Sequence, residues 1–308
     1  MTETQPSPLK LFVAISVAIL AVSTSSIFIR FAQAEAPSLV IAASRLLLAS
    51  IFLAFPALSK HRAELQKLTR TELLLGLASG IFLAIHFATW ITSLEYTSVT
   101  NSVVLVSTSP IWVAIFAPFF LNEKITKTVI IGIILTLIGG TIIGLSDSCV
   151  WNGGIRCASL PGGGLGEGSL GNFLALAGAW TVAGYLMIGR RLRANMSLIP
   201  YIFLVYGMAA VVMLVILLVT GNTLFGYSPM TYLWLLLIAI FPQLIGHSTY
   251  NWSLRYLPVA LVAVTTLGEP IGSSILAFVI LKETPSLMQI VGGVLILTGI
   301  YVTSQKNK

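Results

Sequence analysis

Two charged side chains, Arg45 and Glu269, lie well inside apolar stretches that are long enough to cross a lipid bilayer. A charge near the centre of a bilayer is costly, so it normally faces a partner or a water-filled cavity. In one interpretation Arg45 and Glu269 form an ion pair that holds two parts of the chain together. In the other, at least one of them contacts a substrate or a coupling proton. Both interpretations stay open, because buried ion pairs also occur for packing reasons.

Histidines and aromatic residues give the same apolar stretches further chemistry. His86 and Trp90 are four positions apart, as are His247 and Asn251, so the members of each pair share a helical face. Four more aromatic residues are candidates for an aromatic cavity lining: Trp112, Trp180, Tyr185 and Tyr206. The alternative is structural, since Trp and Tyr also form belts at membrane interfaces and a histidine can simply hydrogen-bond between helices.

The second half of the chain repeats the first half at a distance of 160 positions. Residues 93–140 align with 253–300 without a gap and share 16 identities over 48 positions. Chance would give about 5 identities for segments of this composition. The same shift pairs Trp90 with Tyr250, so both halves carry a histidine and an aromatic residue at a similar level. A duplicated membrane protein is built around the interface between its halves.

Two prolines occupy matching places in this repeat. Pro110 and Pro270 are 160 positions apart, each in the middle of an apolar stretch. A proline removes one helical hydrogen bond, so each is expected to kink its helix. Kinks at equivalent places suit a bundle that rocks about a central site.

Composition restricts the class of protein. Hydrophobic residues make up 56% of the 308 residues and charged residues only 9%, with a mean hydropathy of +0.96. A soluble domain of this length needs a more polar surface, so the chain is expected to be embedded in a membrane. The net charge of +7 does not indicate nucleic-acid binding, because no basic run lies beside stacking aromatic residues.

Ten transmembrane helices are expected between the charged segments. They fall near residues 11–29, 37–58, 73–93, 98–121, 128–145, 169–188, 199–219, 231–252, 258–281 and 286–303. On this reading 13 of the 17 basic residues lie on the side of the two termini, and only Arg30, Arg156 and Lys282 lie opposite. The positive-inside rule therefore makes both termini cytoplasmic.

The predicted fold is an all-α polytopic membrane protein built from two inverted five-helix repeats. Because five is an odd number, the two halves enter the membrane in opposite senses, as in carriers that work by alternating access. We divide the chain into a first repeat at 1–146, an extracytoplasmic Gly-rich loop with two cysteines at 147–168, and a second repeat at 169–308. The simpler alternative is a duplicated scaffold without a transport role.

The only two cysteines, Cys149 and Cys157, fall in the loop between the repeats. The charge rule puts this loop outside the cytoplasm, where disulfides persist, so a Cys149–Cys157 bridge is predicted. Two unpaired thiols are the alternative. The Gly-rich segment 161–168 lacks the pattern of a phosphate-binding loop and is interpreted as a flexible link.

Several of these segments resemble the EamA domain of the drug/metabolite transporter superfamily. The resemblance rests on Thr108–Trp112 and Leu121–Lys124 in the first half, Leu267–Ile271 and Leu281–Thr284 in the second, and the arginine-bearing Ala43–Leu46. It covers nearly the whole chain and implies a secondary carrier, often an exporter of amino acids or other small metabolites, with both termini inside. The long loop between the repeats departs from the short link of many relatives.

The expected function is therefore export of small organic metabolites by alternating access, in the cytoplasmic membrane. An importer, a passive channel and a membrane-embedded enzyme are the alternatives. An enzyme would need a nucleophile with its base or paired carboxylates, yet only one carboxylate lies within the predicted spans and the three histidines are isolated. We expect no catalytic residue, metal or cofactor. The expected partners are a small-molecule substrate, membrane lipid and a coupled proton, with no nucleic acid, and a homodimer is left open.

Overall fold

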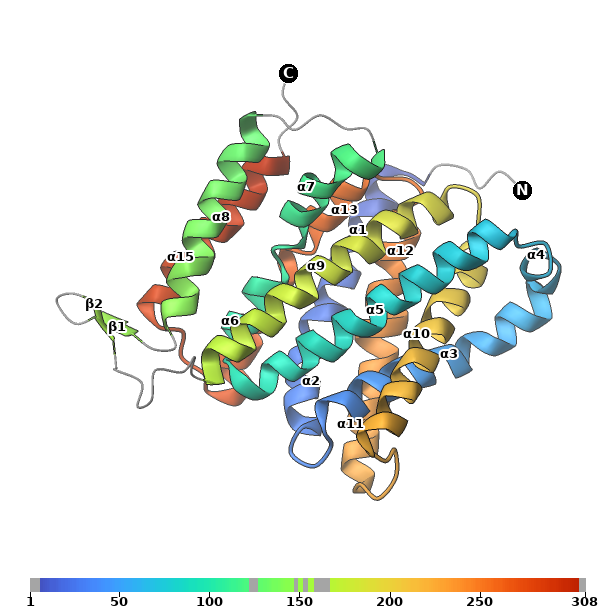
Figure 1. Ribbon diagram of the computed structural model, residues 1–308, viewed down its shortest axis with the longest axis horizontal. Helices are drawn as coiled ribbons and strands as arrows, with labels where there is room; N and C mark the ends of the chain where they lie inside the picture. The colour runs from blue at the N-terminus through green and yellow to red at the C-terminus, as the bar shows by residue number, and fades with distance from the viewer. Residues whose placement is uncertain (1–5, 122–126, 147–148, 152–154, 158–166, 305–308) are drawn as a thin grey trace.

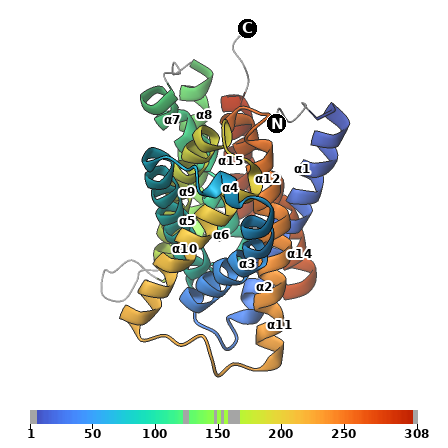
Figure 2. The same cartoon turned by 90° about the vertical axis from the view of Figure 1, so that its right-hand side faces the viewer.

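The protein is a bundle of helices in which the two halves of the chain are packed against each other (Figures 1 and 2). The computed structural model describes residues 6–121, 127–146, 149–151, 155–157 and 167–304. The first half contains α1 (Pro8–Ser23), α2 (Ser25–Ala32), α3 (Ser38–Lys60), α4 (Arg62–Leu65), α5 (Arg70–Tyr96), α6 (Val99–Val106), α7 (Ser109–Leu121) and α8 (Lys127–Ser146).

The remaining elements begin with a short hairpin and include two π-helical segments. Its elements are β1 (Cys149–Trp151), β2 (Ile155–Cys157), α9 (Glu167–Arg193), α10 (Leu198–Thr220), α11 (Pro229–Ile238), the π-helix η1 (Ala239–His247), α12 (Ser248–Ser253), α13 (Val259–Thr265), α14 (Gly268–Leu276), the π-helix η2 (Ala277–Leu281) and α15 (Leu287–Ser304).

Each of the ten predicted spans coincides with helical structure. Among the described residues, eight continuous or nearly continuous helices are long and apolar enough to cross a membrane. The other two, α8 and α15, contain shorter apolar stretches at Ile130–Ile143 and Leu287–Gly299. The chain is thus a helical, multi-pass membrane protein, while the number of ten spans and the orientation of the termini stay predictions.

Local sequence accounts for where several helices begin and end. Thr69 caps α5 and forms a reciprocal capping box with Glu72, which satisfies two free donors of the first turn. Pro229 stands at the start of α11, behind the capping residue Ser228, where its missing N–H costs nothing. Gly221 ends α10 with a left-handed backbone conformation, at φ 71°, that residues with a Cβ rarely adopt.

The packing of the helices repeats under the same shift of 160 positions as the sequence. Equivalent helices contact each other directly in two places, α3 with α10 and α8 with α15. In addition, α5 packs on α9 in the same way that the α11–η1–α12 segment packs on α1 and α2. The two halves therefore form equivalent sets of contacts, as expected from a pseudo-twofold arrangement of two copies.

Both helices that carry the predicted kinks are interrupted at equivalent places. One break separates α6 from α7 just before Pro110, and the other separates α13 from α14 just before Pro270. Each proline therefore lies in the first turn of a half-helix, where its missing N–H costs no helical hydrogen bond. The breaks place irregular backbone inside the bundle, which membrane proteins tolerate where it is buried or lines a cavity.

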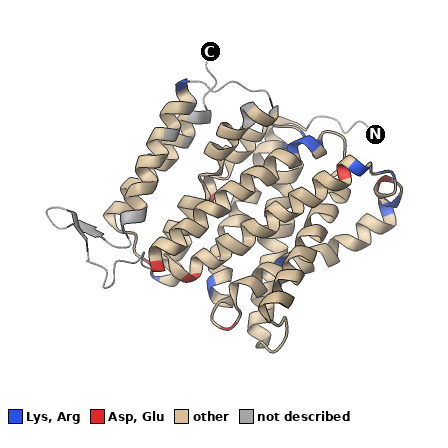
Figure 3. Ribbon diagram, viewed as in Figure 1, with Lys and Arg blue, Asp and Glu red and all other residues tan. Residues whose placement is uncertain are grey.

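Basic residues gather along one edge of the bundle. In Figure 3 the Lys and Arg segments lie mainly along the upper edge, where α1 begins and α15 ends in Figure 1. We call this the basic edge and the other one the opposite edge. The charged helix and loop residues at the opposite edge include the carboxylates Glu35, Glu95, Glu167 and Glu283 and the cations Arg30 and Lys282.

The loop between the repeats contains a small β-hairpin that the all-helical prediction did not include. Strands β1 and β2 are antiparallel, and their register sets Cys149 opposite Cys157. Directly opposed residues of an antiparallel pair have Cα atoms about 4.5–5.5 Å apart, a separation that a disulfide can span. The Cys149–Cys157 bridge stays a prediction. Of the Gly-rich segment 161–168, residues 161–166 lie outside the described residues.

At the opposite edge, Glu35 ties the α2–α3 loop to the start of α11. Its carboxylate accepts hydrogen bonds from the Ser228 backbone N–H at 2.9 Å and from the Thr231 hydroxyl at 2.8 Å. These bonds, the Ser228 backbone bond first, lower the pKa of Glu35 below its ordinary value of 4.5. The charged form of Glu35 is thus the one that holds the two loops together.

We expect this contact to be sensitive to acid. Because the pKa of Glu35 is lower in the folded chain, the contact is complete above the unfolded value of 4.5 and is lost as the pH falls through the folded value. Hydrogen exchange of the Ser228 amide, corrected for intrinsic rates, should accelerate in acid in the wild type. In Glu35→Ala, which lacks an acceptor for this amide, exchange should be fast at every pH, and equal protection in both proteins at neutral pH would contradict the assignment.

Candidate functional site

A cavity lies at the interface between the two halves of the chain. It is lined by residues of α5, α6, α7, α9, η1, α12 and α14 and of the two helix breaks: His86, Trp90, Val106, Ser107, Ser109, Val182, Tyr185, Leu186, His247, Tyr250, Thr266 and Glu269. Its volume of about 50 Å³ is enough for a few water molecules. It is far below the roughly 300–1,000 Å³ of pockets that hold small organic ligands. In this structure the cavity is therefore too small for such a ligand.

Equivalent residues of the two repeats meet in this cavity. Three pairs that are 160 positions apart both line it: Trp90 with Tyr250, Val106 with Thr266, and Ser109 with Glu269. A fourth pair, Phe87 and His247, is in direct edge-to-face contact with ring centroids 5.2 Å apart. Residues related by the repeat come together only near its symmetry axis, so the cavity lies on that axis.

Glu269 enters the cavity from the second helix break. It stands in the first turn of α14, one residue after the start of this half-helix, where the helix dipole attracts a negative charge. Among the residues that the structure describes, its carboxyl group has no hydrogen bond or ion pair. Glu269 thus offers an unoccupied carboxyl group inside a buried cavity, where a ligand amine or a proton can be held.

Two histidines face each other across the cavity. The rings of His86 and His247 are 6.4 Å apart between centroids, and His86 stacks on Trp90 at 5.9 Å. The Nδ1 atom of His86 is 2.9 Å from the Gly178 carbonyl oxygen on α9. Because a carbonyl can only accept, His86 carries a proton on Nδ1. His247 ends the π-helix η1, a kind of segment found frequently at functional sites.

Arg45 is fully buried one layer away and is not among the residues that line the cavity. Its Nε donates to the Gln243 side-chain oxygen at 2.6 Å and its Nη1 to the Ser25 hydroxyl at 3.1 Å. The guanidinium carbon also lies 3.9 Å from the centre of the Phe87 ring, a cation–π contact. Its Nη2 atom has no partner among the described residues.

Arg45 and Glu269 are close enough to interact electrostatically, yet the two are not in direct contact. Among the described residues the only ion pairs within 4.0 Å are Arg30–Glu283 and His61–Glu64. The geometry therefore does not contain the direct Arg45–Glu269 bridge of the structural interpretation. A buried cation without a carboxylate partner has no obvious benefit for stability, because burial removes its hydration.

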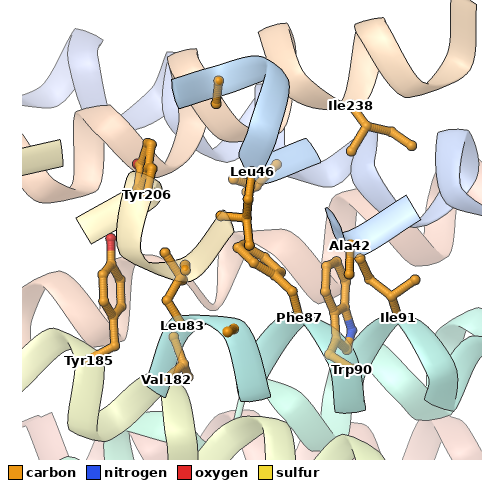
Figure 4. Packing of buried hydrophobic residues seen from close by; sticks show 14 of the residues in the cluster. Ala42, Leu46, Leu83, Phe87, Trp90, Ile91, Val182, Tyr185, Tyr206 and Ile238 are labelled. Atoms are coloured by element: carbon orange, nitrogen blue, oxygen red, sulfur yellow. The ribbon is translucent and has the colours of Figure 1, made fainter. Parts of the chain in front are cut away.

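Of the other predicted site residues, Tyr185 reaches the cavity and Asn251 lies behind it. The Asn251 side-chain nitrogen donates to the Tyr206 hydroxyl at 3.1 Å and to the Tyr185 hydroxyl. Figure 4 shows the Tyr185 ring rising from α9 toward the Tyr206 ring on α10, and Phe87 and Trp90 rising from α5 toward Leu46 and Ala42 of α3. Asn251 and Tyr206 thus support the cavity wall instead of facing the cavity.

Trp112 and Trp180 lie away from the cavity. They contact each other edge-to-face at 5.1 Å, and 40% of Trp180 is exposed on the lateral surface. Sequence reasoning also left out several residues of the site, namely Gln243, Ser107, Ser109 and Thr266. The repeat itself could have identified Ser109, because it is the equivalent of Glu269.

A model of the EamA-like transporter family matches this chain twice, over residues 9–145 and 169–305. The chain belongs to the EamA-like transporter family. The two matches coincide with the two copies that the 160-residue repeat defines. The chain is thus a membrane transporter with two copies of one domain.

The transporter is similar over most of its length to curated proteins of other organisms. It is 25% identical over 313 residues to the uncharacterized transporter YetK of Bacillus subtilis, which covers 96% of this chain and 87% of the relative. It is also 25% identical over 264 residues to an uncharacterized transporter of Clostridium kluyveri, and this match covers 85% of this chain and 82% of the relative. A crystal structure at 17% identity shares the fold, with a TM-score of 0.66 and 96% of both chains covered.

Proposed function

We propose that this transporter exports small organic metabolites, such as amino acids, across the cytoplasmic membrane by alternating access at the central cavity. The observation that carries the proposal is the lining of this cavity by equivalent residues of both repeats, such as Trp90 and Tyr250. A site on the symmetry axis of two copies is reached equally well from either side when the copies rock against each other. In this mechanism the two repeats are inverted in the membrane.

The chemistry of the cavity suits a small molecule with both apolar and polar parts. Its walls are mainly aromatic and aliphatic, and its polar groups come from Glu269, two histidines, three hydroxyl-bearing side chains at the helix breaks, two tyrosines and one tryptophan. Binding sites for small molecules commonly combine apolar walls with a few placed polar groups. Since the cavity now holds only about 50 Å³, the repeats must separate before a metabolite enters.

The experiment that tests this proposal compares metabolites inside and outside cells that express the chain, with Glu269→Gln and empty cells as controls. Export predicts a small set of compounds that are depleted inside, enriched outside, and unchanged in both controls. Accumulation inside would indicate an importer, and a flux that neither saturates nor responds to a gradient would indicate a channel. Identical profiles in expressing and empty cells would contradict a transport role under these conditions.

Contacts between the repeats close the opposite edge of the bundle. The Glu283 carboxylate accepts from the Val99 backbone N–H at 2.9 Å, at the start of α6, and lies 3.5 Å from the Arg30 guanidinium. Arg30 also donates to the Thr97 carbonyl at 2.9 Å. Glu283 of the second repeat is therefore held by elements of the first. We call the contacts of Glu283 with Val99 and Arg30 the latch, and we propose that they break when the site opens toward this edge.

Loosening this latch is expected to expose the cavity. In a cysteine-free background carrying Ser109→Cys, the additional change Glu283→Gln should increase labelling by a membrane-impermeant maleimide from that side about fivefold. This corresponds to the loss of about 1 kcal/mol from a partly exposed ion pair. Glu95→Gln is the matched control, because Glu95 lies at the same edge but bonds only to Ser38 of its own repeat. Equal labelling of both variants would contradict the latch.

A further inference from the structure

A second hollow lies on the lateral surface of the bundle, away from the central cavity. It is a groove between α5, α7 and α9, three helices that pack together at this place. Figure 1 shows α5 and α9 running side by side, with α7 above them. The groove has a volume of about 490 Å³, compared with about 50 Å³ for the central cavity. It opens on a surface that faces lipid in a membrane.

The groove is apolar along its length and carries one charge at one end. Phe82, Phe116, Phe120 and Trp180 supply most of its aromatic surface. Among the described residues that line it, the one charged side chain is Arg191, in the last turn of α9 at the basic edge. Its side chain is exposed and makes no hydrogen bond or ion pair with the described part of the chain. The site therefore offers a free guanidinium group next to an aromatic channel.

The length of the groove matches one leaflet of a bilayer. Trp180 and Arg191, at its two ends, are eleven positions apart on the same helix. At a rise of 1.5 Å per residue this is about 16 Å. The hydrocarbon core of a bilayer is about 30 Å thick, so one leaflet accounts for about 15 Å of it. An acyl chain that begins at the level of Arg191 would end near Trp180.

We propose that this groove is a binding site for one anionic phospholipid from the leaflet at the basic edge. The phosphate of a headgroup that carries no compensating cation binds the Arg191 guanidinium, which presents paired N–H donors to phosphate oxygens. One acyl chain lies in the groove against the aromatic side chains and reaches Trp180. Nothing in this proposal depends on the transported substrate, so it stands or falls independently of the proposed function.

Gly184 keeps the groove open. It lies on α9 among the lining residues, and a Cβ added there would stand 2.9 Å from the Phe82 ring. A larger side chain would have to displace Phe82 and would occupy the groove. The face of α9 that turns the other way carries Val182, Tyr185 and Leu186, which line the central cavity. A lipid in the groove therefore touches the helix that forms one wall of the transport site.

The test uses the purified full-length protein in delipidated detergent micelles. Phosphatidylglycerol and phosphatidylcholine with identical acyl chains are titrated, and the apparent affinity is taken from the rise in unfolding temperature. The wild type should bind phosphatidylglycerol at least tenfold more tightly than phosphatidylcholine. Arg191→Gln should remove this preference, whereas Arg62→Gln, which changes another exposed arginine of the basic edge, should keep it. Gly184→Leu should weaken the binding of both lipids.

A second measurement locates the acyl chain and does not depend on the folding of Gly184→Leu. Phosphatidylglycerol brominated in the middle of its chains should quench the wild-type tryptophan emission, and most of this quenching should be absent in Trp180→Phe. Equal affinities of the wild type for the two lipids would overturn the proposal. So would a loss of preference in Arg62→Gln as large as in Arg191→Gln, or full quenching in Trp180→Phe.

Discussion

The double variant Arg45→Met/Gln243→Leu is expected to be as thermostable as the wild type and to transport nothing. Arg45 is fully buried and has no carboxylate partner among the described residues, so the fold bears the cost of its lost hydration. Replacing both Arg45 and its hydrogen-bond partner Gln243 with apolar residues of similar size removes this cost, and of the two hydrogen-bond partners of Arg45 only the Ser25 hydroxyl loses its donor. Apolar replacement of buried ionic groups is often neutral or stabilising by about 1–4 kcal/mol.

Single variants test whether Arg45 is needed for transport or for the stability of the fold. Arg45→Ala should be destabilised by about 2–4 kcal/mol, because it leaves a void and an unpaired Gln243 oxygen. Arg193→Met is the matched control. Arg193 is equally buried, but its side chain donates to the backbone carbonyls of Asn251 and Met196, so its loss should lower the unfolding temperature. A double variant that melts well below the wild type would show that Arg45 stabilises the fold.

The sequence predicts those features that depend on the repeat and on hydropathy. Ten apolar segments can be located because a membrane span must be long and nearly uncharged. His86, Trp90 and His247 all reach the cavity, together with Glu269 and Tyr185. The shift of 160 positions by itself pairs Trp90 with Tyr250, and residues related in this way approach each other near the axis between two copies.

The sequence does not predict which way each helix is rotated. In a membrane the lipid-facing side of a helix is as apolar as the buried side, so the periodic signal that orients a soluble helix is weak. For this reason the sequence suggests a cavity position for Trp180, whereas Trp180 lies on the lateral groove. For the same reason the sequence suggests a cavity position for Asn251, whose side-chain nitrogen instead donates to the hydroxyls of Tyr185 and Tyr206.

Other features depend on contacts between distant segments. Arg45 and Gln243 are 198 positions apart and meet only after α3 has packed on the π-helix η1. The wider i→i+5 hydrogen bonding of η1 occurs around Pro242, which lacks an N–H and whose ring crowds the preceding turn of a regular α-helix. No local pattern around Arg45 indicates that its partner is a glutamine. The choice between the two interpretations of Arg45 therefore requires the fold.

Glu269→Gln is expected to abolish transport that is driven by a proton gradient while leaving the exchange of substrate across the membrane. Glu269 is an unpaired carboxyl group in the cavity, at the start of a half-helix and within electrostatic range of Arg45. It can take up a proton in one state and release it in the other. Glutamine keeps the shape and most of the hydrogen-bonding capacity of Glu269 but cannot take up or release a proton. Without this proton transfer the gradient has no means of driving the substrate.

The measurement uses proteoliposomes with an imposed pH gradient and, in parallel, substrate exchange without a gradient. Because glutamine does not titrate, the gradient-driven flux of Glu269→Gln should fall to that of liposomes without protein, while exchange continues. Glu95→Gln, in which a carboxylate at the opposite edge is changed, should respond to the gradient like the wild type. If Glu269→Gln is driven as strongly as the wild type, its carboxyl group does not carry the proton. If both gradient-driven transport and exchange are lost, Glu269 binds the substrate directly, because a group that only couples the proton would leave exchange intact.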